Sequence, residues 1–172
     1  FLGNTDPKKN VARTLKAYSL YLKQSDKKRP LLIADLSKDK LDAILREQQI
    51  EEIKPYLSYP GYIPNKDLAY LYNGAFVFLY TSLRESFGIP MLEAMACGTP
   101  VITGNTSAMP EIAGEGGILV NSLNAKEIAE KILYLEQDQI FYQNQIKYGL
   151  NRVPKFSWAQ TAENLLSLYK TI

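Results

Sequence analysis

Two glutamates flanking a predicted helix start are the residues of this chain best suited to bind a polar ligand. Glu85 and Glu93 belong to the stretch ESFGIPMLEAMACGTPV, which ends at Val101. Pro90 suits the first position of a helix, because the N–H that proline lacks would have no partner there. A helix N-terminus offers unpaired N–H groups and a partial positive charge to an anion. Since nearby carboxylates can accept hydrogen bonds from ligand hydroxyls, the stretch predicts a site for a phosphorylated, hydroxyl-bearing ligand.

Each glutamate also has an ordinary explanation. A glutamate in the first helical turn, where we expect Glu93, complements the helix dipole. Glu85 could be a solvated loop residue. Paired carboxylates occur in glycoside hydrolysis as well. A carboxylate built into a helix beside an anion site, however, suits a phosphorylated ligand better than a neutral glycan.

Two lysines could supply positive charge to the same ligand. Lys8 and Lys9 follow a predicted strand end and precede a predicted helix, where a lysine can act as a point charge on phosphate. The alternative is a pair of exposed lysines flanking a helix cap. The sequence has no DxD motif, so it does not suggest a carboxylate-held Mg²⁺. A metal-free site must neutralise a diphosphate with lysine, arginine and helix N–H groups, and this predicts a role for Lys9.

Several other site types are disfavoured. The chain has no histidine, which excludes His-based triads and His-ligated metal within it. Neither GxGxxG nor GxxxxGK[ST] is present, so nicotinamide and P-loop nucleotide sites are not indicated. Cys97 follows Ala96 near a predicted helix end, and nothing nearby would activate its thiol. We therefore interpret Cys97 as a small buried side chain rather than a nucleophile.

The composition indicates one ordinary globular domain covering residues 1–172. Hydrophobic residues make up 46% and charged residues 22%, and the net charge of +2 predicts no attraction to nucleic acid. No apolar stretch approaches the roughly 18 residues of a transmembrane helix. A single cysteine excludes an internal disulfide and favours a reducing compartment, so we expect a cytoplasmic protein.

Continuous apolar runs alternate with helical patterns at least five times. This arrangement predicts a doubly wound α/β domain with a parallel, Rossmann-like sheet of about six strands and helices on both faces. We expect strand residues at 1–2, 31–34, 53–57, 76–80, 99–103 and 117–120. Helices are expected at 10–24, from 37, from 64, at 90–96, 110–113 and 125–137, and two more within 139–172 around Trp158.

Ligands of such sheets bind beyond the carboxyl ends of the strands. Three predicted loops lie at strand carboxyl ends and are candidates for one shared site. They are Gly3 to Lys9, Gly61 to Pro64 and Thr81 to Ile89.

The stretch ESFGIPMLEAMACGTPVI resembles retaining glycosyltransferases of the GT-B fold, in the family called glycosyltransferase group 1 or family 4. Glu85 and Glu93 match the E-x7-E motif of that family. Further segments resemble family motifs in the expected order: Gly3 with Pro7 to Asn10 (G…PRKN), Gly61 to Ile63 (GYV), Asp67 to Tyr72 (ELA.LY), Ser107 to Gly117 (S..PE..G..G) and Phe156 to Trp158 (FSW). The resemblance covers nearly the whole chain and is to the C-terminal, donor-binding half of such enzymes.

The resemblance implies a role for each matched residue. Lys9 would contact the donor diphosphate, and Glu85 would bind hydroxyls of the donor sugar near the reacting carbon, so these two are the expected catalytic residues. Glu93 would hold the ribose hydroxyls, and Tyr62 and Ile63 would border the base. The remaining expected binding residues are Gly3, Lys8, Phe87, Gly88, Ile89, Met91 and Leu92.

The sequence departs from the family pattern at the expected diphosphate clamp. The arginine that often follows the first glycine is Asn4 here, and the arginine of PRKN is Lys8. Lys8 and Arg84 are both candidates for the missing charge. The catalytic histidine and the acceptor site of the family belong to an N-terminal domain. We expect this chain, which begins at Phe1 without Met, to be a fragment lacking that domain.

The resemblance implies metal-independent transfer of a hexose-type group from a UDP-, GDP- or ADP-linked donor, with retention, in polysaccharide biosynthesis. The acceptor would be a sugar or a lipid-linked glycan bound through the missing domain. The full-length protein would be cytoplasmic, with peripheral contact at the inner membrane as an option. Two alternatives stay open: a non-catalytic nucleotide-sugar-binding module, which the intact glutamate pair disfavours, and a nucleotide-sugar hydrolase or epimerase.

Overall fold

Five short parallel strands form the centre of the computed structural model, which describes residues 1–171. β1 pairs with β2, and the other three strands pair in the order β3-β4-β5. An isolated parallel bridge joins Leu2 to Ala34. The strands are β1 (Leu31–Ala34), β2 (Leu57–Gly61), β3 (Phe78–Tyr80), β4 (Val101–Gly104) and β5 (Gly117–Val120).

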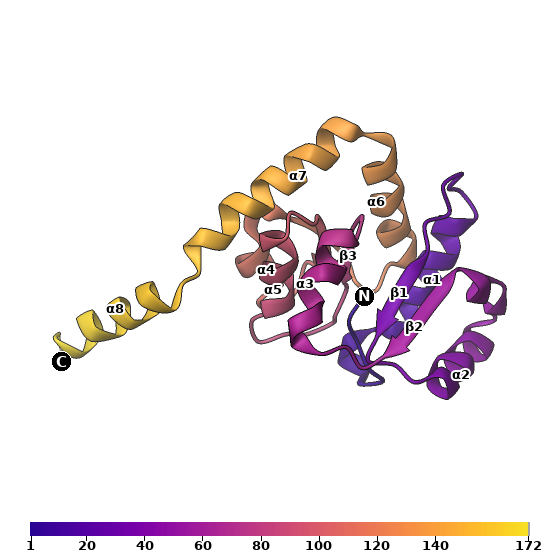
Figure 1. Ribbon diagram of the computed structural model, residues 1–172, viewed down its shortest axis with the longest axis horizontal. Helices are drawn as coiled ribbons and strands as arrows, with labels where there is room; N and C mark the ends of the chain where they lie inside the picture. The colour runs from indigo at the N-terminus through magenta and orange to yellow at the C-terminus, as the bar shows by residue number, and fades with distance from the viewer. Residues whose placement is uncertain (172) are drawn as a thin grey trace.

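Helices connect the strands and cover them (Figure 1). The α-helices are α1 (Val11–Leu22), α2 (Lys38–Gln48), α3 (Asn65–Gly74), α4 (Ile89–Ala96), α5 (Met109–Ala113), α6 (Ala125–Gln137), α7 (Gln139–Arg152) and α8 (Trp158–Tyr169). Short 3₁₀ segments are η1 (Pro7–Lys9), η2 (Glu51–Tyr56), η3 (Gly114–Gly116) and η4 (Val153–Lys155). None of the helices within residues 1–171 has the length and apolar character needed to cross a membrane.

The strand side chains alternate between two hydrophobic cores. Leu79 and Ile102 belong to the core that contains residues of α1 and α6, whereas Phe78 and Val101 belong to the core that contains residues of α4 and α5. Burying one such side chain contributes about 1.5–3 kcal/mol. Helices therefore stabilise the sheet from both faces, which confirms the predicted doubly wound α/β fold.

The prediction of about six strands was too high. The structure has five strands within residues 1–171, and the expected first strand is present only as the bridge at Leu2. The strand expected at Ile53 to Leu57 was also wrong, because η2 occupies Glu51–Tyr56 and β2 starts at Leu57. Pro55 lies within η2, and a proline cannot donate a backbone hydrogen bond to a strand ladder.

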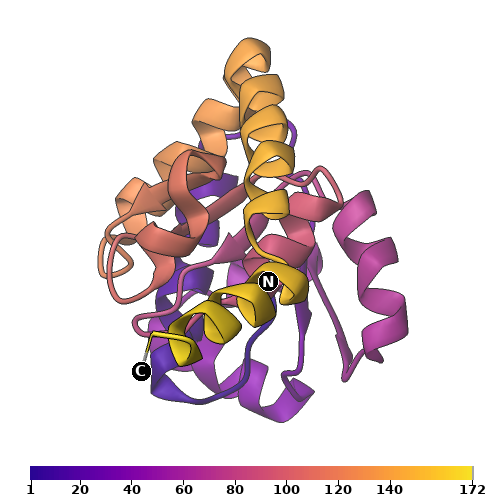
Figure 2. The same cartoon turned by 90° about the vertical axis from the view of Figure 1, so that its left-hand side faces the viewer.

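The predicted helices are present, with some differences in detail. Leu68 and Leu71 of α3 are only half-buried, and Tyr72 is the buried residue of that helix. The C-terminal section forms α7 and α8 as predicted, although its last residue, Ile172, lies outside the described residues. Every described residue of α8 is exposed, and the helix projects from the end of α7 away from the sheet (Figure 1, Figure 2).

Candidate functional site

The loop that contains η1 and the loop after β3 are joined by a backbone hydrogen bond. The Leu83 N–H donates to the Lys8 carbonyl at 2.7 Å, which joins the loop after β3 to the η1 loop. The third predicted loop reaches the same edge through the end of β1. Asp35 N–H donates to the Gly61 carbonyl at 2.9 Å, and Gly3 N–H donates to the Ala34 carbonyl at 3.3 Å. The parallel strands thus bring segments distant in sequence to one edge.

Lys9 and Glu85 form the charged centre of this edge. The Lys9 ammonium donates to Glu85 Oε1 at 2.7 Å, and both side chains are largely buried, at 22% and 13% exposed. The ammonium also lies 5.5 Å from the centre of the Tyr80 ring, within the range of a cation–π contact. The two residues expected to be catalytic are therefore in direct contact.

The Glu85 carboxylate is ionised more readily than an ordinary glutamate. Burial opposes its ionisation, but the Lys9 ammonium and the hydroxyls of Ser82 and Tyr80 outweigh that effect and lower the pKa of Glu85. Burial and the neighbouring Glu85 charge raise the pKa of Tyr80. Tyr80 therefore stays a neutral hydroxyl facing a negative carboxylate.

The backbone of Glu85 is held by a loop from the neighbouring strand. Ser107 Oγ donates to the Glu85 carbonyl at 2.6 Å and accepts from the Glu85 N–H at 3.3 Å. Thr106 Oγ1 donates to the Leu83 carbonyl at 3.1 Å. Ser107 itself has a left-handed φ of 60°, which is uncommon for a residue with a side chain. The loop after β4 thus fixes the segment that carries Glu85.

Glu93 lies on α4 and is anchored by α3. The Tyr72 hydroxyl donates to Glu93 Oε2 at 3.2 Å. Burial and the nearby Glu93 charge raise the pKa of Tyr72, so its hydroxyl stays protonated as a donor. The expectation that Glu93 lies in the first turn was wrong, because α4 starts at Ile89 and has no acidic residue in that turn. The bond to Tyr72, rather than the helix dipole, orients this carboxylate.

The start of α4 combines exposed and buried positions. Gly88 is buried at the N-cap with φ of 98°, a conformation that side chains disfavour. Phe87 and Ile89 are 40% and 55% exposed, so the helix start is open to solvent on that side. Met91 is fully buried and Leu92 half-buried, and both belong to the core beneath α4. Any contribution of Met91 to a ligand would therefore come from its backbone.

The other predicted residues lie around this centre. Gly3 is buried, Tyr62 is 73% exposed, and Ile63 is half-buried just after β2. Lys8 is on the surface and pairs with Asp6 at 3.3 Å. Arg84, the other candidate for the missing clamp charge, is exposed. Both cations can thus reach toward solvent near the edge, and neither contacts Glu85 as Lys9 does.

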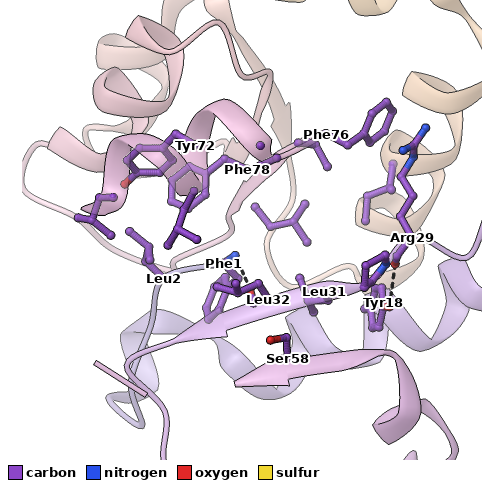
Figure 3. Close-up of a pocket in the computed structure, with 18 of the residues that line it drawn as sticks. Phe1, Leu2, Tyr18, Arg29, Leu31, Leu32, Ser58, Tyr72, Phe76 and Phe78 are labelled. Carbon is purple, nitrogen blue, oxygen red and sulfur yellow. Dashed lines mark hydrogen bonds between the residues drawn. The ribbon is translucent and has the colours of Figure 1, made fainter. Parts of the chain in front are cut away.

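An apolar groove lies elsewhere. It has a volume of about 440 Å³ and separates the two hydrogen-bonded groups of strands, with Leu31 and Leu32 on one side and Phe76 and Phe78 on the other (Figure 3). Neither Lys9 nor Glu85 lines it. Apolar grooves are often ligand sites, but the pair of Lys9 and Glu85 lies at the strand-end loops, so the groove is not the candidate site.

Four residues that support the site were not singled out from the sequence. Asn10, Ser107 and Tyr72 appeared only within motif matches, and Tyr80 only as the end of an expected strand. Asn10 could have been identified, since it directly follows Lys9 and precedes a helix. The tyrosines could not, because twelve are scattered along the chain.

No cluster of three or more His, Cys, Asp or Glu side chains within residues 1–171 is arranged to hold a metal ion. The polar groups that the site does offer are an ammonium, two carboxylates and the N-terminal end of a helix. This set is suited to a ligand that carries both an anion and hydroxyl groups.

The chain belongs to the glycosyl transferases group 1 family, whose sequence model matches residues 1–152. The O-antigen chain mannosyltransferase B of Escherichia coli is 31% identical over 172 residues, which are 100% of this chain and 45% of that protein. This finding confirms the family resemblance inferred from the E-x7-E stretch.

Solved structures share the fold. Sucrose-phosphate synthase from Thermosynechococcus elongatus gives a TM-score of 0.78 at 26% identity, over 99% of this chain and 44% of that one. Anabaena HepE in complex with UDP and glucose gives a TM-score of 0.82 at 16% identity, over 99% and 48%. The chain thus spans less than half the length of each of these proteins.

Proposed function

We propose that this chain is the donor-binding part of a glycosyltransferase that moves a hexose-type group from a nucleoside diphosphate to an acceptor with retention. The contact between Lys9 and Glu85 at the start of α4 carries the proposal, because it joins a cation for phosphate to a carboxylate for sugar hydroxyls. The family membership and the mannosyltransferase relative support the same assignment.

In this proposal each charged group binds a different part of the donor. Lys9 and the N–H groups at residues 87–89 stabilise the negative charge that grows on the departing diphosphate, which is electrostatic catalysis. Glu85 orients the sugar, and Glu93 holds the ribose. Tyr62 and Ile63 border the base, and Gly3, Lys8, Met91 and Leu92 complete the donor surface. The leaving phosphate deprotonates the acceptor in a front-side displacement.

The charge of the diphosphate is neutralised without a metal in this scheme. Lys9, supplemented by Lys8 or Arg84, takes the place that a carboxylate-held cation occupies in other nucleotide sites. The acceptor, a sugar or a lipid-linked glycan, binds a second domain of the longer protein. We place that protein in the cytoplasm, with peripheral contact at the inner membrane where a lipid-linked acceptor is used.

A panel of UDP-, GDP- and ADP-linked hexoses, tested by thermal shift on the 172-residue chain, examines donor binding. A ligand that binds only the folded chain raises the melting temperature by mass action. We expect one nucleotide to raise it clearly. GDP- and UDP-mannose are the first donors to test, since the Escherichia coli relative is a mannosyltransferase. If no nucleotide sugar changes the melting temperature at millimolar concentration, the proposal fails.

Transfer itself requires the longer protein. We expect the 172-residue chain to bind donor without transferring sugar, because the acceptor surface is supplied elsewhere. Full-length protein incubated with donor alone should turn it over slowly compared with a reaction that contains acceptor. Rapid turnover of donor without acceptor would instead identify a hydrolase or an epimerase.

A further inference from the structure

We propose that Asn10 is a positioning residue that sets the Lys9 ammonium against the Glu85 carboxylate. Asn10 lies between η1 and α1 and is 5% exposed. Its side-chain amide donates two hydrogen bonds, to the Thr81 carbonyl at 3.0 Å and the Ser122 carbonyl at 2.7 Å. One side chain thus ties the Lys9 segment to the loops after β3 and β5.

Two cross-links hold Lys9 from both sides. Before it, the Lys8 carbonyl accepts from the Leu83 N–H at 2.7 Å. After it, the Asn10 amide reaches the Thr81 carbonyl. Because Glu85 follows Leu83 by two residues, the backbone that carries the ammonium and the backbone that carries the carboxylate are joined at two points. We infer that these two hydrogen bonds set the distance between the Lys9 ammonium and the Glu85 carboxylate.

Asparagine is suited to this position for two separate reasons. The backbone is left-handed, with φ of 58° and ψ of 31°, and asparagine tolerates that region better than most residues. The amide then supplies two N–H donors to two carbonyls, which a carboxylate cannot do. Glycine would keep the backbone conformation without the donors, and aspartate would replace the donors with acceptors.

The Asn10 amide lies in a buried polar layer together with Thr14, Thr81 and Ser122. Thr14 Oγ1 donates to the Asn10 carbonyl at 3.0 Å and lies 2.5 Å from Thr81 Oγ1. Ser122 Oγ donates to the Ser82 carbonyl at 3.1 Å. Water cannot readily replace a donor lost from such a layer, so removing the amide leaves buried carbonyls without partners. The Thr81 to Glu85 segment then loses one of the two hydrogen bonds that join it to the Lys9 segment.

The test compares Asn10→Gly and Asn10→Asp with Ser25→Ala. Ser25 is a buried polar residue whose hydroxyl donates to Glu136 at 2.7 Å, and it does not contact the candidate site. Calorimetry measures binding of the donor identified by the panel. NMR titration measures the pKa of Glu85 without ligand, and this pKa reports whether the Lys9 ammonium still faces the carboxylate.

We expect Asn10→Gly to weaken donor binding about tenfold, because two buried hydrogen-bond donors are lost. Asn10→Asp should weaken it further, because carboxylate oxygens would then face the two carbonyl oxygens. The pKa of Glu85 should rise toward its ordinary value in both variants. Added to Lys9→Ala, Asn10→Gly should have little further effect on affinity, because it acts through Lys9. Ser25→Ala should lower the melting temperature and leave both measurements unchanged.

The expected loss of donor affinity in the Asn10 variants rests on the proposed function. The proposed function and the positioning role of Asn10 can fail separately. If the unmodified chain binds no nucleotide sugar, the proposed function fails, and the Glu85 titration still decides the role of Asn10. A folded Asn10→Gly variant with unchanged Glu85 pKa overturns the inference. Equal loss of affinity from Asn10→Gly with and without Lys9→Ala also overturns it, since the effect would then not pass through Lys9.

Discussion

Lys9 and Glu85 are 76 positions apart in the sequence and meet at 2.7 Å. The sequence pattern could indicate that each residue lies in a loop that follows a strand. In a parallel fold such loops lie at the same edge of the sheet. That the two charges contact each other directly could not be predicted. It depends on the Leu83 bond to Lys8 and on the Asn10 amide, which are interactions between segments distant in sequence.

At the same scale, the two glutamates should be separable by their ligands. We expect Glu93→Gln to weaken binding of the free nucleoside diphosphate by about 1–2 kcal/mol, the range for hydrogen bonds to charged groups. The change also removes the charge that accepts from the Tyr72 hydroxyl. Isothermal titration calorimetry of each variant with the diphosphate measures the loss.

Glu85→Gln should behave in the opposite way. It frees the Lys9 ammonium from its carboxylate partner, so the free diphosphate should bind equally well or better, while the intact nucleotide sugar should bind more weakly. Both substitutions keep the shape of the side chain and remove one charge, so each controls for the other. The reverse order of effects would contradict the assignment of Glu85 to sugar and Glu93 to ribose.

At the scale of elements, the start of α4 depends on one glycine. A Cβ on Gly88 would lie 2.6 Å from Met91 Cε, and the backbone there has φ of +98°. Met91 is fully buried, so its methyl group must move within the core to make room. We expect Gly88→Ala to lower the free energy of unfolding by about 1–3 kcal/mol and to weaken donor binding, as measured by urea denaturation and calorimetry.

Gly61→Ala is the matched control for that change. Gly61 also has a positive φ, of +81°, but a Cβ there would meet no atom within 4 Å. It should therefore show the cost of backbone strain without the collision against Met91. Equal destabilisation by the two substitutions would show that packing around Met91 contributes nothing to holding the helix start.

Most elements were predictable because their apolar patterns and turn residues agree. The apolar run at Leu31 to Ala34 and the helical pattern from Ala125 to Gln137 match β1 and α6 in their bounds. The failure at Ile53 to Leu57 has a physical cause. A short run with one buried residue and a proline fits a 3₁₀ segment as well as a strand, and tertiary packing decides. Similarly, a helix that starts one residue earlier than Pro90 moves Glu93 out of the first turn.

At the scale of the whole molecule, the chain aligns with 45% of the Escherichia coli mannosyltransferase and 44% of the sucrose-phosphate synthase. The prediction for sugar transfer therefore belongs to the longer protein, whereas donor binding can be tested on the 172 residues.

The contact between Lys9 and Glu85 also makes donor entry an exchange reaction. In the proposed function, a diphosphate that draws the ammonium away leaves a partly buried carboxylate without its cation, and the hydroxyls of the attached sugar fill that vacancy. The two halves of the donor are therefore thermodynamically coupled, each favouring the binding of the other. Once the sugar has been transferred, the coupling is lost and the ammonium returns to Glu85, which helps to expel the spent nucleotide.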